Sequence, residues 1–320
     1  MIQISIVIPL YNEEESLPEL IDWISRVMKT HGFLYEVLMV DDGSTDGSWA
    51  VIEDLSKEHP IKAMKFNRNY GKSAALNVGF KHAVGEVIIT MDADLQDSPD
   101  EIPALYEMVK SGNHLVSGWK KKRFDPITKT IPSKLFNGVT RILSGIKLHD
   151  FNCGLKAYDK KLVKTLDIYG EMHRYIPVIA KRNGFTKITE KVVEHRARKY
   201  GVTKFGIERF VYGFLDLLSI SFVSRYKKRP MHFFGTLGTL SFVLGFLFIL
   251  WIIWEKVRAI YILKSSDYRD IVEQPLFFLA IAAIIIGVQL FLAGFVGEMM
   301  VMNSHKRNDY ILDDTIGLDQ

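Results

Sequence analysis

The chain has 320 residues, a formal net charge of +4 and one cysteine. The small net charge argues against nucleic acid as a partner, because nucleic-acid binders carry strongly basic patches. The lone Cys153 excludes an internal disulfide and fits a reducing compartment. Hydrophobic residues make up 48% of the chain and concentrate near the C-terminus, so the composition indicates a polar first part followed by a membrane-associated part.

Apolar runs alternate with segments of helical periodicity over the first third of the chain. We expect strands within 3–11, 35–44, 61–71, 86–94 and 114–119, and helices within 12–32, 45–59, 72–85 and 98–112. Apolar strands that alternate with helices predict an α/β fold, with a mostly parallel sheet covered on both faces. Ligands bind beyond the carboxyl ends of such strands. The polar residues at these ends are Pro9 to Glu13, Asp41 and Asp42, Asn67 to Lys72, and Asp92 to Asp97.

Asp92 and Asp94 follow the fourth predicted strand. Two residues apart in extended chain, their side chains point to the same side and offer hard oxygen ligands suited to Mg²⁺ or Mn²⁺. A calcium loop is rejected, because it needs Gly at its sixth and Glu at its twelfth position, where this chain has Asp97 and Pro103. Direct acid–base chemistry by the pair stays open. Asp97 is expected to start the next helix as a cap.

Two more strand ends carry polar residues. Asp41 and Asp42 end the second strand, where a carboxylate can accept from a base or a ribose, bind a metal through water, or form an Asx-turn. The stretch NRNYGKS offers Arg68, Lys72 and a glycine turn before a helix, a favourable place for an anion or an ordinary turn. It is not a P-loop, because Phe66 stands where that motif needs glycine.

The pattern changes after residue 120. A basic segment with two prolines leads into residues 133–145, which predict a short amphipathic helix suited to a membrane interface. Packing of this helix on the sheet is an equal alternative. Residues 205–224 are strongly apolar with three charges and are expected to lie along the membrane.

Two uncharged runs, Phe233 to Trp254 and Pro275 to Gly297, are long enough to cross a bilayer. Basic residues at 225–229 and 305–307 flank them, so the positive-inside rule places both chain ends in the cytoplasm. The beginning of the chain does not read as a signal peptide. The expected domains are therefore a cytoplasmic catalytic domain at 1–228, a two-helix membrane region at 229–304 and a cytoplasmic tail at 305–320. Small residues in the spans permit close helix packing, including that of a homo-oligomer.

The strand-end motifs VIPLYNEEESL, VDDGSTDGS, NRNYGKSAALNVGF and DADLQDSP together resemble family-2 glycosyltransferases with the GT-A fold. DFNCGLKAYD, MHRYIP and RKYGVTKFG, followed by two spans, are similar to the polyprenyl-phosphate branch, which includes bactoprenol glucosyltransferases and relatives of dolichol-phosphate mannose synthase. The QxxRW string of processive synthases is absent. Thr203 stands where the late YGxSK pattern has serine, which keeps a hydroxyl.

The resemblance implies roles for matching residues. Metal binding falls to Asp92 and Asp94, sugar contact to Gln96, and the role of base or sugar-positioning carboxylate to Asp150, for which a loop cap is the alternative. The expected nucleotide-sugar site comprises Pro9, Tyr11, Asn12, Glu13, Asp41, Asp42, Arg68, Lys72 and Asp92. The expected acceptor-phosphate site comprises Arg198, Lys204, Ser133 and Lys134, with lipid headgroups as the alternative ligand of the first two.

The implied reaction is metal-dependent, inverting transfer of a hexose from a nucleotide diphosphate sugar to membrane polyprenyl phosphate. UDP-glucose is the expected donor; other UDP-hexoses and GDP-mannose stay open, as does Mg²⁺ against Mn²⁺. The expected location is the inner membrane. A non-catalytic membrane scaffold and transfer to a soluble acceptor are the competing hypotheses.

Overall fold

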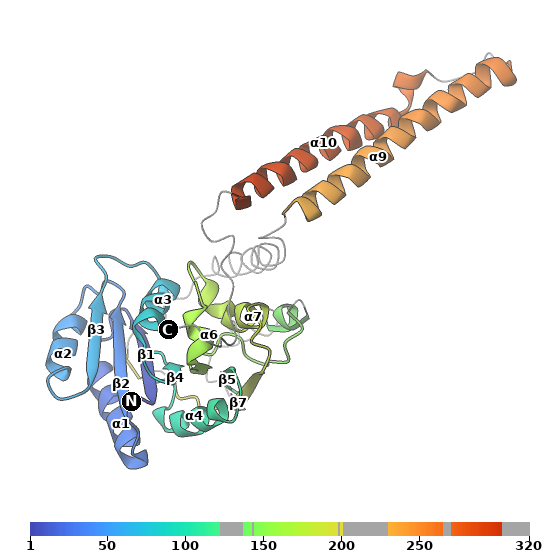
Figure 1. Ribbon diagram of the computed structural model, residues 1–320. Helices are drawn as coiled ribbons and strands as arrows, with labels where there is room; N and C mark the ends of the chain where they lie inside the picture. Colours follow the sequence, from blue (N-terminus) through green and yellow to red (C-terminus); the bar gives the residue numbers. More distant parts are fainter. Residues whose placement is uncertain (122–136, 143, 198, 201–229, 265–269, 303–320) are drawn as a thin grey trace, which may run out of the picture. The chain divides into compact units, whose positions relative to one another are not determined.

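The computed structural model describes residues 1–121, 137–142, 144–197, 199–200, 230–264 and 270–302 (Figure 1). The chain forms two compact units, 1–221 and 222–320. Each is described by itself.

The first unit is built on a seven-stranded sheet of order β3-β2-β1-β4-β6-β5-β7. All neighbouring pairs are parallel except the two that β6 makes with β4 and β5. The predicted mostly parallel sheet is confirmed, and β6 is its reversed strand. The strands are β1 Ile4–Leu10, β2 Tyr35–Asp41, β3 Ile61–Lys65, β4 Val87–Thr90, β5 Leu115–Trp119, β6 Lys156–Asp159 and β7 Ile188–Val192.

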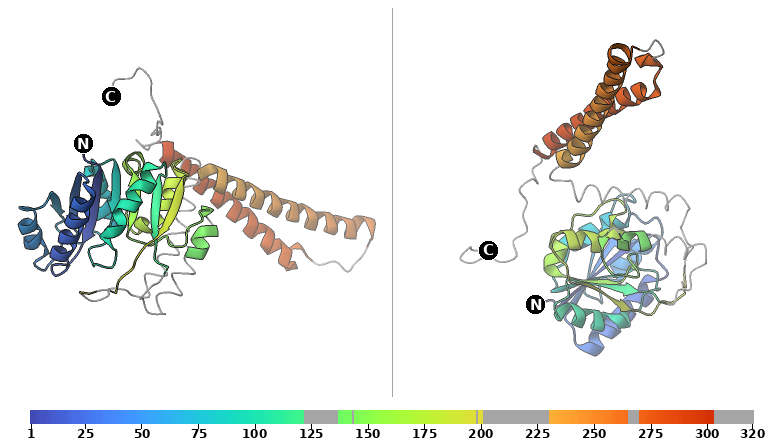
Figure 2. Two further views of the ribbon diagram at one scale, coloured as in Figure 1. Left: turned by 90° about the horizontal axis from the view of Figure 1, so that it is seen from below. Right: turned by 90° about the vertical axis from the view of Figure 1, so that its right-hand side faces the viewer.

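Helices cover both faces of this sheet (Figure 2). One face packs against α1 (Leu17–His31), α2 (Ser48–Leu55) and α4 (Ile102–Lys110). The other face packs against α3 (Lys72–His82), α6 (Lys160–Lys164) and α7 (Ile176–Arg182). Short 3₁₀ turns at Pro99–Glu101 (η1) and Met172–Tyr175 (η2) precede α4 and α7.

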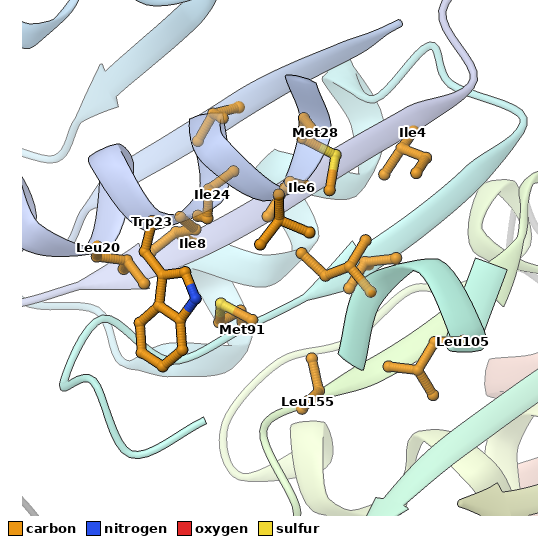
Figure 3. Close-up of a cluster of buried hydrophobic side chains, with 14 of the residues drawn as sticks. Ile4, Ile6, Ile8, Leu20, Trp23, Ile24, Met28, Met91, Leu105 and Leu155 are labelled. Atoms are coloured by element: carbon orange, nitrogen blue, oxygen red, sulfur yellow. The ribbon is translucent and has the colours of Figure 1, made fainter. Parts of the chain in front are cut away.

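Strand β1 shows why the chain folds this way. Ile4, Ile6 and Ile8 point to the α1 side, where they meet Trp23 and Met28 (Figure 3). The alternate residue Val7 joins the cluster on the α3 side. Because successive side chains on a strand point to opposite faces, a fully apolar strand needs helices on both sides to remove it from water.

A buried carboxylate fastens the start of β2. Glu36 accepts hydrogen bonds from the hydroxyl of Ser5 at 2.5 Å and the N–H of Val84 at 3.0 Å, and an ion pair joins it to Lys62 at 2.7 Å. Burial works against ionisation of Glu36, but these partners hold its pKa below the usual range. The charge is therefore fully supplied with donors, as a buried carboxylate requires.

The second unit contains α9 (Pro230–Val257), which runs into a π-helical turn at Arg258–Ile262, and α10 (Pro275–Met302), preceded by a 3₁₀ turn at Ile271–Glu273. Both predicted spans lie within these helices, which are long and apolar enough to cross a membrane. The helices lie side by side in opposite directions, since Gly238 faces Gly287 while Gly245 faces Ala280.

Close backbone contact joins the two helices. A Cβ added at Gly238 would lie 2.6 Å from the carbonyl oxygen of Gly287, and one at Gly245 would lie 2.6 Å from that of Ala280. Ser241 also donates a hydrogen bond to the Ala283 carbonyl at 2.8 Å. The small residues that suggested a homo-oligomer are thus used within one chain. Oligomerisation stays a prediction, without this support.

The two predicted interface helices are described only in part. Residues 137–142 are helical, whereas 133–136 and 205–224 lie outside the described residues. In the visible part, Val139 packs against a small apolar cluster and Thr140 is buried, while Ile142 is 82% exposed. Val139 and Thr140 therefore face the domain and Ile142 faces outward, and the membrane-interface role of this helix stays a prediction.

Candidate active site

The site lies at the carboxyl edge of the central strands. Leu10 pairs with Asp41, and Val7 pairs with Thr90, so β1, β2 and β4 end side by side. The polar residues that follow these strands therefore meet at one edge, as parallel-sheet geometry requires. Strand β6 runs the opposite way and brings its first residue, Lys156, to the same edge beside Thr90.

The loop after β1 is tied to the loop after β2. Asn12 has φ 53°, a left-handed conformation that Asn tolerates. Its N–H donates to the hydroxyl of Ser44 at 2.9 Å, and its Oδ1 accepts from the N–H of Thr45 at 2.8 Å. The N–H of Glu13 donates to Ser48 at 2.9 Å. In this structure both predicted nucleotide residues brace the two loops against each other.

Asp41 and Asp42 serve different partners. Asp41 is fully buried and accepts from the N–H of Ser44 at 2.8 Å. Asp42 accepts from the N–H groups of Tyr70 at 2.7 Å and Gly71 at 2.9 Å. Burial raises the pKa of Asp42 and the neighbouring Asp41 adds to this effect, against the hydrogen bonds. The predicted anion position before the third helix is thus filled by the protein's own carboxylate.

Asp92 forms an ion pair with Lys72, the first residue of α3. Burial opposes ionisation of Asp92, but the charges of Lys72 and Lys120 lower its pKa to about 2. The backbone at Gly154 lies against this carboxylate, since an added Cβ would come 2.6 Å from its Cγ. Asp92 is therefore ionised at neutral pH and confined on one side.

A tight turn follows Asp92. The N–H of Gln96 donates to Oδ1 of Asp94 at 3.2 Å, and the Gln96 carbonyl accepts from the N–H of Arg196 at 3.0 Å. Between them Leu95 has φ 60°, which is rare for a branched residue, and its side chain is buried in the core. The left-handed Leu95 anchors the turn while Asp94 and Gln96 stay partly exposed. Such local strain is concentrated at functional sites.

Asp97 does not cap the next helix. It is 1% exposed and pairs with Lys120, whose Nζ lies 2.8 Å from its Oδ1. Ser98 precedes the 3₁₀ turn without a capping hydrogen bond from its side chain. Burial works against protonation of Lys120, yet the charge of Asp97 raises its pKa. The prediction that Asp97 caps the next helix is wrong, because Asp97 forms an ion pair with Lys120, the residue that follows β5.

Asp150 lies in the loop before β6 and is 1% exposed. Its Oδ1 accepts from the N–H of Asn152 at 3.1 Å, and its backbone carbonyl accepts from Ser117 at 3.2 Å. The loop-cap role named as the alternative is therefore present. The predicted role of Asp150 as base or sugar-positioning group stays a prediction.

Three further residues at this edge were not among the predicted site residues. Lys156 is 4% exposed and donates to the carbonyl of Cys153; burial lowers its pKa. The hydroxyl of Ser73 lies 3.0 Å from both the backbone N and Nδ1 of His173, across 100 positions of sequence. Burial, followed by the charges of Lys72 and Arg174, holds the pKa of His173 well below its usual range. The motif MHRYIP contained the one available signal.

Three other predicted residues belong to β1 and to the segments that follow β1 and β3. Pro9 is a half-buried residue of β1, and Tyr11 follows that strand partly exposed. Arg68 is exposed and stacks over the ring of Tyr70, with its Cζ 4.7 Å from the ring centroid. The predicted acceptor residues Ser133, Lys134, Arg198 and Lys204 lie outside the described residues.

The described acidic residues suit a hard divalent cation. Asp92 is ionised, as a metal ligand must be, and Asp94 keeps a partly exposed carboxylate two positions away. In the described part of the chain no cluster of three or more His, Cys, Asp or Glu side chains forms a complete protein cage. A cation with two carboxylates and several other oxygens is the arrangement that Mg²⁺ takes with a phosphate-bearing substrate.

Comparison with known proteins decides the family. The model of the family "Glycosyl transferase family 2" matches residues 5–167. The chain belongs to glycosyltransferase family 2. It is 35% identical over 313 residues to a dodecaprenyl-phosphate galacturonate synthase of Rhizobium johnstonii, covering 96% of this chain and 90% of that protein. It is 34% identical over 301 residues to an undecaprenyl-phosphate 4-deoxy-4-formamido-L-arabinose transferase of Pseudomonas fluorescens, covering 93% and 84%. This family-2 chain is therefore a glycosyltransferase.

Solved structures agree on the fold of this glycosyltransferase. Glucosyl-3-phosphoglycerate synthase from Mycobacterium tuberculosis, in complex with Mn²⁺, UDP-glucose and phosphoglyceric acid, superposes with a TM-score of 0.55 at 20% identity, over 68% of this chain and 79% of that one. Mannosyl-3-phosphoglycerate synthase from Rubrobacter xylanophilus gives 0.57 at 15% identity, over 71% and 75%. The first unit thus has the predicted GT-A fold.

Proposed function

We propose that the chain transfers a sugar from a nucleotide diphosphate sugar to polyprenyl phosphate in the membrane. The match to two polyprenyl-phosphate sugar transferases carries this proposal, because it extends over 84% or more of each relative. The apolar helices α9 and α10 support it. A polyprenyl acceptor cannot leave the bilayer, so its enzyme must work at the membrane surface.

The acidic edge of the sheet is the proposed donor site. Asp92 and Asp94 would hold Mg²⁺ or Mn²⁺, which when bound neutralises charge on the leaving diphosphate. Lys72 adds a positive charge beside Asp92. Preorganised cations at the position where negative charge grows stabilise the transition state more than the ground state.

The acceptor needs little activation by the protein. A phosphate monoester has its second pKa at about 6, so the attacking oxygen is already anionic at neutral pH. A buried carboxylate that already caps its own loop, as Asp150 does, is then better suited to positioning than to proton removal. We expect loss of Asp150 to slow transfer less than loss of Asp94. The proposed contacts to the acceptor phosphate are Arg198, Lys204, Ser133 and Lys134. The proposed transfer inverts the configuration at the anomeric carbon.

Two donors deserve direct comparison. UDP-glucose is the donor that the overall resemblance to bactoprenol glucosyltransferases suggests. UDP-galacturonate is the second candidate, because the galacturonate synthase matches this chain over 96% of its length.

The decisive experiment uses membranes that contain the full chain. They are incubated with polyprenyl phosphate, Mg²⁺ or Mn²⁺ and a panel of labelled nucleotide sugars, and label is followed into the organic-extractable lipid. The proposal predicts lipid labelling from one donor and a loss of about 100-fold or more in Asp94→Asn, since this change removes a charge used in the transition state. Label that stays in the water phase would support a soluble acceptor, and no transfer at all would support a scaffold.

We further propose an inner-membrane location, with both chain ends in the cytoplasm and the short loop between the helices outside. Reporter fusions at the N-terminus, at the C-terminus and between α9 and α10 test this topology. A reporter active outside the cell at either terminus would overturn it.

A further inference from the structure

Lys72 and Asp92 form an ion pair within the proposed donor site. Both side chains are partly exposed, at 30% and 31%. The backbone before Lys72 is held by Asp42, which accepts from the N–H groups of Tyr70 and Gly71. The backbone before Lys72 is thus held in place, and both side chains of the pair are partly open to solvent.

The other cation that acts on Asp92 is already engaged. Lys120 pairs with the buried Asp97 at 2.8 Å. Among the described residues, Lys72 is the one that forms an ion pair with Asp92. Gly154 blocks the other side of the Asp92 carboxylate. A divalent cation that approaches Asp92 must therefore meet the ammonium of Lys72.

This arrangement couples two ligands. Both partners of this ion pair are about one-third exposed and so within reach of solvent and ligands, and the pair can open when a better arrangement is offered. A cation alone offers only repulsion to the ammonium, whereas a diphosphate supplies anionic oxygens to the cation and the ammonium together.

We propose that Lys72 is the exchangeable counter-ion of Asp92 and makes the divalent cation and the nucleoside diphosphate bind as one unit. This inference rests on the proposed donor site. It predicts that the protein without nucleotide binds the cation weakly, and that each ligand tightens the other by the same factor.

The test measures Mn²⁺ binding by electron paramagnetic resonance on the purified full chain in detergent, with and without saturating UDP, and with GDP in a parallel titration. In the wild type a nucleoside diphosphate should tighten Mn²⁺ binding by about tenfold or more. Lys72→Met should bind Mn²⁺ alone about tenfold more tightly, the repulsion expected between a divalent and a monovalent cation about 6 Å apart in water. The nucleotide effect in this variant should fall by about tenfold relative to the wild type, because the cation no longer has to displace the ammonium, and the remainder comes from direct contact between the cation and the diphosphate.

Two control variants separate the explanations. Lys72→Arg keeps the charge and should behave as the wild type. Lys65→Met removes a charge from the end of β3, where Lys65 lies 3.9 Å from Asp41, and should leave the coupling unchanged. If Lys72→Met keeps the full coupling, or if Lys65→Met abolishes it equally, the inference is wrong. If the wild type binds neither nucleotide, the proposed donor site is wrong as well.

Discussion

Replacing Gly154 by alanine tests whether the position of Asp92 matters for transfer. The added carbon would lie closest to Oδ2 of Asp92 and 2.6 Å from its Cγ, whereas ordinary contact begins at 3.4 Å. The carboxylate must therefore retreat by roughly 1 Å, and misplacement of a functional group by about 1 Å costs roughly 100-fold in rate. We expect kcat/KM for lipid labelling to fall by about 100-fold, equivalent to about 2.7 kcal/mol.

The same substitution should hardly affect folding. The side chain of Asp92 is 31% exposed and can move toward solvent, so we expect the free energy of unfolding to change by less than about 1 kcal/mol. Gly79→Ala is the contrasting variant, because its added carbon would collide with the buried side chain of Val7. It should cost about 1–3 kcal/mol of stability through overpacking and keep its activity per folded molecule. A Gly154→Ala enzyme with the wild-type rate would refute the reasoning.

Three further predictions concern residues that hold the domain and its site together. Lys120→Met should destabilise the protein by about 3–5 kcal/mol, because Asp97 is left charged and buried. Adding Asp97→Asn should restore much of the lost free energy of unfolding, as measured with denaturant. Equal losses in the single and double variants would contradict the pairing. The pKa of Glu36 is lowered in the folded protein. Its contribution to stability is therefore complete above the unfolded carboxyl pKa of about 4.3 and is lost as the pH falls through the lower folded pKa. Glu36→Gln should flatten the acid side of the stability–pH curve, and an unchanged acid side would contradict this prediction. Ser73→Ala should raise KM for the donor about threefold to tenfold by releasing the ring of His173. The free energy of unfolding should stay unchanged. Donor kinetics at wild-type values would show that this contact has no role in binding.

The sequence analysis located the acidic edge because it depends on a local rule. Each strand ends in its own polar residues, and parallel strands share one edge. Asp42, Lys72 and Asp92 could therefore be placed together before any coordinates, and the structure shows Asp42 beside the turn of Lys72 and Lys72 paired with Asp92.

What the sequence analysis missed depends on contacts between distant segments. The partner of Asp97 is 23 positions away at the end of β5, and local chemistry alone favoured a helix cap. Ser73 and His173 meet across 100 positions. Strand β6 has only four residues and is antiparallel to its neighbours. Its short alternation of polar and apolar residues therefore did not indicate that Lys156 lies at the site edge.

The base of the helical hairpin has a consequence for how deeply it can sit in lipid. Glu298 near the end of α10 accepts a hydrogen bond from the N–H of Met231, at the start of α9, at 3.3 Å. A helix start leaves amide groups without partners, and a lone carboxylate resists leaving water. Here the two needs are met by one contact across the hairpin. If the hairpin crosses a bilayer as proposed, this contact moves with the helices and keeps the Met231 amide paired in a thicker or a thinner bilayer.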